Sequence, residues 1–130
     1  MILLDTHVVL WLALTPENIS PAAAAAIGEA DSAGVQPGIS VITLYEIAYA
    51  IRRGRIQVFV PQQVFLNRLK SRFKVLPVTD AIAQCAAELA EPFHGDPMDR
   101  IIAATAIVED CTLISRDDRI REAGVCRVIW

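Results

Sequence analysis

A chain of 130 residues is the size of one ordinary domain, because two units of half that length would each be too small to hold a core. With 54% apolar and 21% charged residues, it is too hydrophobic to be intrinsically disordered. A formal net charge of −3 argues against a generic basic nucleic-acid coat, but not against a nucleic-acid enzyme with local basic patches. We expect one domain over residues 1–130.

The N-terminal apolar run is too short for a membrane anchor. Val8–Leu14 is far below the roughly 18 residues of a membrane span, and no basic segment precedes it. The cysteines, Cys85, Cys111 and Cys126, are odd in number and match neither a zinc pattern nor a disulfide framework. We therefore expect neither signal peptide nor anchor, and three reduced, mostly buried thiols in a cytoplasmic protein.

The first half of the chain alternates short apolar runs with helical stretches. Met1–Leu4 predicts a buried strand that ends at Asp5, and either Asp5 or Thr6 then caps a helix that stops before Pro16. The next predicted elements are an alanine-rich helix over 22–33, a strand over 39–41, an amphipathic helix over 43–53 and a helix over 61–72.

The second half repeats this alternation. Its predicted elements are a strand over 74–78, a helix over 80–91, a loop over 93–96, a helix over 97–109, a strand over 112–115, a helix over 117–123 and a strand over 127–129. Asp96 and Pro97 stand in the order that starts a helix. Because short apolar strands alternate with helices, we predict an α/β architecture with a mostly parallel sheet.

Four acidic residues occupy strand ends and helix starts. Asp5 directly follows the first predicted strand, and Asp117 follows the strand over 112–115 with one residue between. Glu46 and Asp99 lie in the first turns of predicted helices. Ligands of an open parallel sheet bind outside the carboxyl ends of its strands, so we expect these carboxylates at one edge.

Four clustered carboxylates require a counter-charge. At about 5 Å and an effective dielectric near 20, each like-charged pair repels by roughly 3 kcal/mol, so protons or a cation must lie among them. Oxygen ligands without a His/Cys set favour Mg²⁺ or Mn²⁺ over zinc. Such an ion would generate a hydroxide-like nucleophile and neutralise phosphate charge.

Several of these polar and aromatic residues also have a purely structural interpretation. An acid in a first helical turn gains about 0.3–1 kcal/mol from the helix dipole without any function. Asp96 fits a helix cap better than a ligand, and His7 fits a structural or surface histidine. Trp11 and Trp130 flank apolar residues and are interpreted as packing residues, not as surfaces for base stacking.

Two of three basic clusters share a segment with a candidate acid. The cluster over 68–74 is interpreted as ordinary solvated helix ends. The other two lie beside Glu46 and Asp117. Their candidates for contacts with a nucleic-acid backbone are Arg52, Arg53 and Arg116.

Four segments together resemble the acidic motifs of PIN-domain ribonucleases, and especially the VapC-like toxins of type II toxin–antitoxin systems. The segments read ILLDTHVVLWL, SVITLYEIAYAI, HGDPMDRIIAATAI and TLISRDDRI, and they span residues 2 to about 119 in the family's order. By position, the family's four acids match Asp5, Glu46, Asp99 and Asp117, and its small hydroxyl residues that assist the site match Thr6 and Ser115.

This resemblance implies a three-layer α/β/α fold with a parallel sheet, and an endoribonuclease that depends on Mg²⁺ or Mn²⁺. The four acids would hold the ion and activate water for attack on the RNA phosphodiester. The resemblance also implies a homodimer, inhibition by a small VapB-like antitoxin, and binding of operator DNA through the antitoxin.

The sequence departs little from the family pattern. Met98 stands where an aromatic residue is common. The pair Asp117 and Asp118 leaves the fourth acidic position open between them, and Asp96 is a second acid beside the third motif. We prefer Asp99 there because it leads directly into RIIAATA.

Three other functions stay open. Another Mg²⁺-dependent phosphoryl-transfer hydrolase, such as a phosphatase or receiver domain, usually has a second acid close after the first-strand Asp and a late catalytic lysine. This class is disfavoured because Asp5 is followed by Thr6 and His7, and no late lysine is present. A catalytically inactive PIN-fold binding module is disfavoured by the four acids. The sequence does not distinguish a DNA-specific nuclease from a ribonuclease, and it does not identify the RNA target.

Overall fold

Five parallel strands form the sheet of the computed structural model, which describes residues 1–90, 93 and 95–130. The strands are β1 (Ile2–Leu4), β2 (Gly38–Ser40), β3 (Lys74–Leu76), β4 (Thr112–Ile114) and β5 (Val128–Ile129). The helices are α1 (Thr6–Leu14), α2 (Pro21–Ser32), α3 (Val41–Arg52), α4 (Gln62–Arg72), α5 (Asp80–Glu88), α6 (Pro97–Val108) and α7 (Asp118–Ala123), with a 3-10 helix η1 (Pro16–Asn18). The predicted α/β class is confirmed, and every described strand pairing is parallel.

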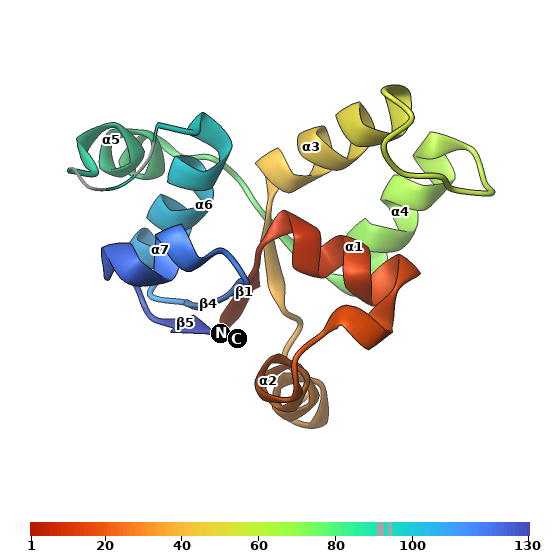
Figure 1. Ribbon diagram of the computed structural model, residues 1–130, viewed down its shortest axis with the longest axis horizontal. Helices are drawn as coiled ribbons and strands as arrows, with labels where there is room; N and C mark the ends of the chain where they lie inside the picture. The colour runs from red at the N-terminus through yellow and green to blue at the C-terminus, as the bar shows by residue number, and fades with distance from the viewer. Residues whose placement is uncertain (91–92, 94) are drawn as a thin grey trace.

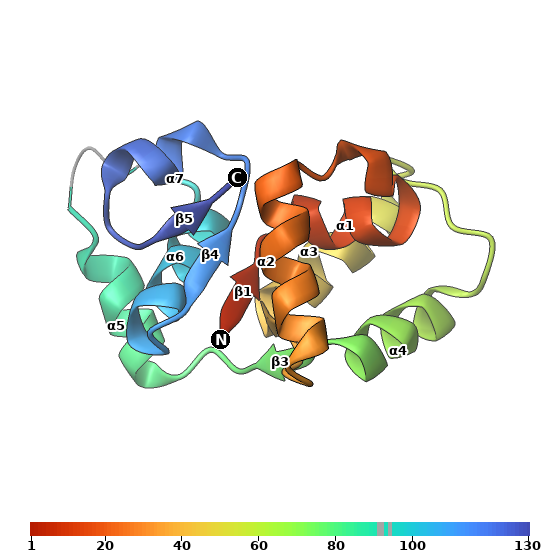
Figure 2. The same ribbon diagram turned by 90° about the horizontal axis from the view of Figure 1, so that it is seen from below.

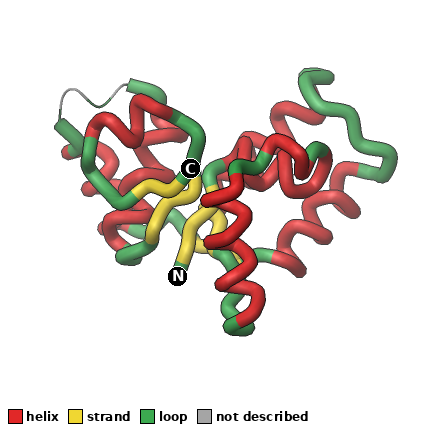
Figure 3. The backbone as a smooth tube through the Cα atoms, turned by 60° about the horizontal axis from the view of Figure 1, so that its bottom comes forward, coloured by secondary structure: helices red, strands yellow, loops and turns green. Residues whose placement is uncertain are grey.

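Helices cover both faces of the sheet (Figures 1 and 2). Alternate residues of a strand point to opposite faces, so both faces need apolar side chains. Leu4 and Ile114 pack with α1, α2, α3 and α4, whereas Leu3 and Leu113 pack with α6 and α7, and all four are fully buried. Figure 3 shows the strands between these two groups of helices, which confirms the three-layer arrangement.

In the strand order β3-β2-β1-β4-β5, the direction in which successive strands are added changes between β1 and β4. From β1 the chain proceeds outward to β2 and β3, and it then returns to the other side of β1 to form β4 and β5. The backbone N–H of Asp5 donates to the Ile114 carbonyl at 3.0 Å, so the ends of β1 and β4 are joined. Ligands of open α/β sheets bind at such a point, beyond the carboxyl ends of the strands.

Several predicted element boundaries are wrong by a few residues. Helix α3 begins at Val41, inside the predicted strand over 39–41, because the Ser40 hydroxyl accepts a hydrogen bond from the Ile42 N–H at 3.2 Å and caps the helix. Glu46 therefore lies in the second turn of α3, not the first. Strand β3 is shorter than predicted, and η1 was not predicted.

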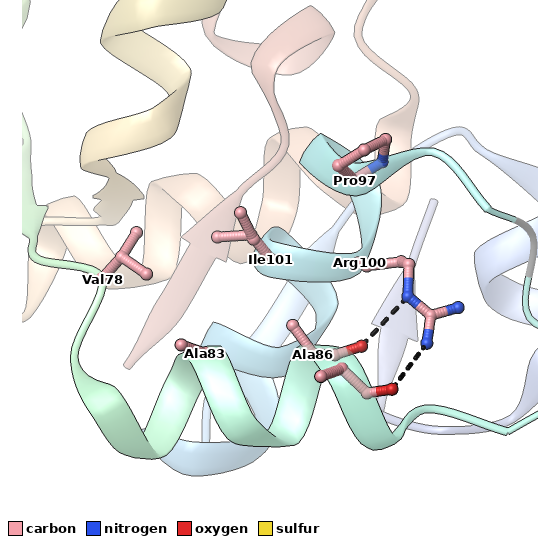
Figure 4. A pocket seen from close by; sticks show the side chains of 7 residues that line it. Val78, Ala83, Ala86, Pro97, Arg100 and Ile101 are labelled. Atoms are coloured by element: carbon pink, nitrogen blue, oxygen red, sulfur yellow. Dashed lines mark hydrogen bonds between the residues drawn. The ribbon is translucent and has the colours of Figure 1, made fainter.

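Helix α5 was predicted to reach residue 91 but ends at Glu88. Beyond its end, residues 91, 92 and 94 lie outside the described part of the chain. The Arg100 side chain of α6 donates to two backbone carbonyls at the end of α5: Nε to Ala86 at 3.0 Å and Nη2 to Leu89 at 2.6 Å. Figure 4 shows this guanidinium at the hollow between α5 and α6. Arg100 thereby ties the first turn of α6, which carries Asp99, to α5.

The described helices do not include a membrane span. Within residues 1–90, 93 and 95–130, no helix combines the length and apolar character that crossing a bilayer requires. The cysteines are free, as predicted. Only Cys111 is buried, whereas Cys85 and Cys126 are partly exposed, so the expectation of mostly buried thiols was too broad.

Candidate active site

Asp5 lies at the centre of the predicted site, directly after β1. It caps α1, and its Oδ1 accepts a hydrogen bond from the Thr6 N–H at 2.8 Å. Its Oδ2 accepts one from the Ser115 hydroxyl at 2.7 Å, and the residue is only 3% exposed. Ser115 Oγ also accepts the N–H of Asp117 at 3.0 Å. Ser115 therefore joins the ends of β1 and β4 to the start of α7.

Glu46 of α3 reaches the same edge through Thr6. The Thr6 hydroxyl donates to Glu46 Oε1 at 2.6 Å. Thr6 Oγ1 also lies 3.0 Å from Thr43 Oγ1, and because Thr6 has one hydroxyl proton, Thr43 donates to Thr6. Burial raises the pKa of Glu46, the Thr6 hydrogen bond opposes that rise, and the charges of Asp5 and Asp96 add to it.

Asp99 lies in the first turn of α6, where the charges of the other three predicted acids act on its carboxyl. Burial is the largest cause that raises the pKa of its carboxyl to about 7, from 3.8. The charges of Asp5, Asp96, Asp117 and Glu46 raise this pKa further, in that order. Helices α1, α3 and α6 all begin at this side of the sheet (Figure 1). The structure thus brings the other three predicted carboxylates within electrostatic range of Asp99.

Asp117 completes this group and is paired with an arginine. It caps α7, and Asp117 Oδ2 accepts from Arg119 Nη2 at 3.1 Å. The same Nη2 lies 3.7 Å from Asp99 Oδ2, so Arg119 bridges two of the acids. The Arg119 side chain is 64% exposed, so water screens its charge. The sequence did not indicate this contact.

The alternatives to the third and fourth acids have separate structural roles. Asp96 caps α6, as predicted: its Oδ1 accepts from the N–H groups of Met98 at 2.9 Å and Asp99 at 3.3 Å. Asp118 is 67% exposed and pairs with Arg121. Asp117, which faces Asp99, is therefore the better candidate for the fourth position. His94, the first residue of the third motif, lies outside the described residues.

The three arginine candidates fall in two different places. Arg116 follows β4 beside the acids, and its backbone N–H donates to His7 Nε2 at 3.0 Å. Arg52 ends α3, and Arg53 lies over the Tyr49 ring, 5.9 Å from its centre. Arg52 lies six positions after Glu46 in the helix, or about 9 Å along the axis. The structure therefore brings Arg116 to the site but not the other two.

The donor chemistry of this edge suits a hard divalent cation. The four acids offer only oxygen atoms, which suits Mg²⁺ or Mn²⁺. Their charges add to the rise that burial causes in the pKa of Asp99. Among the residues that the structure describes, no three Asp, Glu, His or Cys side chains form a preformed metal centre. Binding of an ion would thus have to draw the carboxylates closer together.

Comparison with known proteins agrees with this arrangement. Residues 2–125 match the model of the PIN domain family. The chain is 36% identical over 120 residues to Ribonuclease VapC22 of Mycobacterium tuberculosis, covering 92% of this chain and 89% of that protein.

Solved structures with the same fold have lower sequence identity to this chain. VapBC2 from Rickettsia felis, bound to a DNA fragment from its promoter, has a TM-score of 0.75 and 18% identity, covering 99% of this chain and 98% of that one. FitAcB from Neisseria gonorrhoeae has a TM-score of 0.70 and 24% identity, covering 100% and 97%. At these identities the structures establish the fold, and the family match and the curated relative establish the family. The chain belongs to the PIN-domain family, and within it to the VapC-like members.

Proposed function

We propose that this protein is a Mg²⁺- or Mn²⁺-dependent endoribonuclease and the toxin of a toxin–antitoxin pair. The observation that carries the proposal is the gathering of four carboxylates at the β1–β4 edge, where burial and then the charges of the neighbouring acids raise the pKa of Asp99. A similar protein is named a ribonuclease, which supports RNA as the substrate. The negative edge would repel a phosphodiester unless a cation lay between them.

Asp5, Glu46, Asp99 and Asp117 are the residues that would hold the ion. When bound, a divalent ion supplies an activated water and neutralises charge on the phosphate. Thr6 and Ser115 would keep the Asp5 and Glu46 carboxylates oriented, through the hydrogen bonds described above. These are hydroxyl donors, so they orient the acids without removing their charge.

Asp99 has a second suitable property. A carboxyl with a pKa of about 7 exchanges its proton near neutral pH. In the metal-free protein it holds that proton for part of the time, which reduces repulsion among the acids. Entry of a cation would release the proton, so metal binding would be stronger at higher pH.

The proposal includes partners that the related complexes suggest. We expect a VapB-like antitoxin to cover the site, and operator DNA to bind through that antitoxin, because similar folds occur in toxin–antitoxin complexes, some with DNA. We also expect a homodimer and a cytoplasmic location, the latter because the three thiols are free. Arg52 and Arg53 stay candidates for RNA contacts at a distance from the cut.

Cleavage of cellular RNA tests this function directly. Purified protein, freed of any partner, would be incubated with total RNA in EDTA, Mg²⁺ or Mn²⁺, beside Asp5→Asn, Asp99→Asn and the exposed control Asp118→Asn. We expect discrete cleavage that requires the ion, persists in Asp118→Asn and disappears in the other two variants. Cleavage in EDTA, or undiminished cleavage by Asp5→Asn, would contradict the proposal.

An inactive binding module is the principal alternative. It would leave every RNA intact at all metal concentrations, and Mn²⁺ would not raise its melting temperature. A DNA-specific nuclease would cut single- or double-stranded DNA under the same conditions and leave RNA intact.

A further inference from the structure

A shallow hollow next to the carboxylates has no role in the chemistry described above. It is lined by His7, Trp11, Arg116 and Asp117. Asp117 also belongs to the proposed metal-binding group, so the hollow opens directly beside that group. Its other walls are two aromatic rings and an arginine.

The Trp11 ring is held in place by two other aromatic rings. Its centre lies 5.0 Å from that of His7, edge to face, and 5.5 Å from that of Trp130. Trp11 is partly exposed, and the Arg116 guanidinium lies 5.9 Å from its ring centre. A partly exposed indole whose orientation is already fixed loses little entropy when a flat ligand stacks on it. The interpretation of Trp11 as a packing residue therefore covers only part of its surface.

His7 couples this wall to the first acid. Its Nε2 accepts the Arg116 N–H, which places the proton of the neutral ring on Nδ1. Nδ1 lies 3.6 Å from Asp5 Oδ2. The orientation of the His7 ring, and with it one side of Trp11, is thus fixed from the catalytic edge.

Arg116 supplies a positive charge that no described carboxylate neutralises by an ion pair. Its side chain is exposed, so it can leave the Trp11 ring at small cost and contact a phosphate or a base edge. A cation beside a fixed indole face matches the chemistry that binds a nucleobase.

We propose that this hollow is a subsite for one nucleobase of a single-stranded RNA, with Trp11 as its stacking surface. The proposal rests on the proposed ribonuclease function, because a phosphate at the carboxylates brings an adjoining base to the hollow. The base stacks on Trp11, while Arg116 contacts its edge or the adjoining phosphate. Trp11 and Arg116 then determine which nucleotide is preferred beside the cut.

Tryptophan fluorescence tests the stacking independently of cleavage. The chain has two tryptophans, so Trp130→Phe leaves Trp11 as the sole reporter and Trp11→Phe leaves Trp130. The probe is a single-stranded RNA of about ten nucleotides in Ca²⁺, checked afterwards for integrity, with ribose 5-phosphate as the ligand without a base. We expect saturable quenching of Trp11 by the RNA and none by ribose 5-phosphate.

Binding affinities of matched variants separate stacking from a structural role. We expect Trp11→Ala to weaken RNA binding about 5- to 150-fold, the range for loss of one stacked base, and Trp11→Phe to weaken it much less. Phe59→Ala, which removes a ring that is 90% exposed elsewhere, should have no effect. Melting curves would verify that each variant is folded.

The position of cleavage gives the third readout. In Mg²⁺, Trp11→Ala should raise KM and broaden the nucleotide preference beside the cut. If wild type and Trp11→Ala bind equally and cut the same positions, and Trp11 is not quenched, the subsite is wrong while the ribonuclease function stands. If the wild type neither binds nor cuts RNA, the proposed function fails, and the subsite fails with it.

Discussion

The two halves of the candidate site hold their acids by different means. In the hydroxyl half, Asp5 and Glu46 accept hydrogen bonds from Ser115 and Thr6. In the arginine half, Asp99 and Asp117 face the guanidinium of Arg119 at 3.7 and 3.1 Å. Neutral donors fix the direction of a carboxylate but leave its charge, whereas a cation reduces the charge itself.

This difference explains where the repulsion accumulates. The hydroxyl half holds its carboxylates through uncharged donors, whereas in the arginine half a solvent-exposed cation lies close to both Asp99 and Asp117. Burial is the largest cause of the raised pKa of Asp99, and the charges of acids from both halves add to it. We infer that the hydroxyl half supplies the geometry for a cation, while Arg119 compensates for charge until the cation binds.

Removal of the Asp5 charge should have the largest effect. Asp5→Asn keeps the size of a side chain that is 3% exposed but removes a proposed metal ligand. We expect RNA cleavage to fall by more than about 100-fold, because changes to groups that only support a ligand already cost 10–100-fold. Initial rates at saturating Mn²⁺ measure this, with Asp118→Asn as the control. A loss in both variants would locate the effect outside the site.

Loss of the Ser115 hydroxyl should destabilise the fold as well as the site. Ser115→Ala leaves Asp5 Oδ2 and the Asp117 N–H without the partner that joins them. We expect the free energy of unfolding to fall by about 1–3 kcal/mol. Ser71→Ala, which removes an exposed hydroxyl that donates to the Arg68 carbonyl, should change it by less than about 0.5 kcal/mol. Equal urea midpoints for both variants would disprove a structural role of Ser115.

The pH dependence of stability should identify Asp99. Because the pKa is about 7 in the folded protein and 3.8 is its ordinary value, the native state binds this proton more tightly than the unfolded chain does. Ionisation of Asp99 therefore lowers stability as pH rises between these values, and the full loss is present above about pH 7.

Asp99→Asn cannot ionise, so it should melt at a higher temperature than the wild type at pH 8 in EDTA. The difference should disappear toward pH 4. Melting curves across this range, with Asp118→Asn as the control, measure it. A constant difference at every pH would show that the substitution acts through packing and not through charge.

Arg119 should produce the smallest effect, and its sign distinguishes two roles. If Arg119 competes with the ion for Asp117 and Asp99, Arg119→Ala should bind Mn²⁺ a few-fold more tightly, with the gain reduced by salt. Calorimetric titration at low and moderate ionic strength measures both. Weaker Mn²⁺ binding would show instead that Arg119 orients Asp117 for the ion.

The sequence was sufficient for the strand ends and for the acids that follow them. Asp5 and Asp117 come after short apolar runs, and parallel strands bring such residues to one edge. Local rules failed where a strand signal and a helix signal competed. Val41 belongs to a β-branched run that favours a strand, but the Ser40 cap places it in a helix.

Contacts made only by tertiary packing could not be predicted. The bridge from Arg119 to Asp99 depends on how α7 lies against α6, and nothing in the spacing of these residues along the chain indicates it. The hollow at Trp11 likewise needs Arg116 and Trp130, which lie more than 100 residues further along the chain. Such residues are distant in sequence and meet only because β1 pairs with β4 and β4 pairs with β5.

Mn²⁺ binding measured by titration calorimetry tests most directly the claim that the β1–β4 edge is a metal-dependent site. The comparison uses wild type, Asp5→Asn, Asp99→Asn and Asp118→Asn in buffers of different ionisation enthalpy, which also report proton release. We predict saturable binding to wild type and Asp118→Asn, with proton release near pH 7 from both, and strongly weakened binding to the other two variants. Equal binding to all four proteins, or no binding to the wild type, would contradict the account.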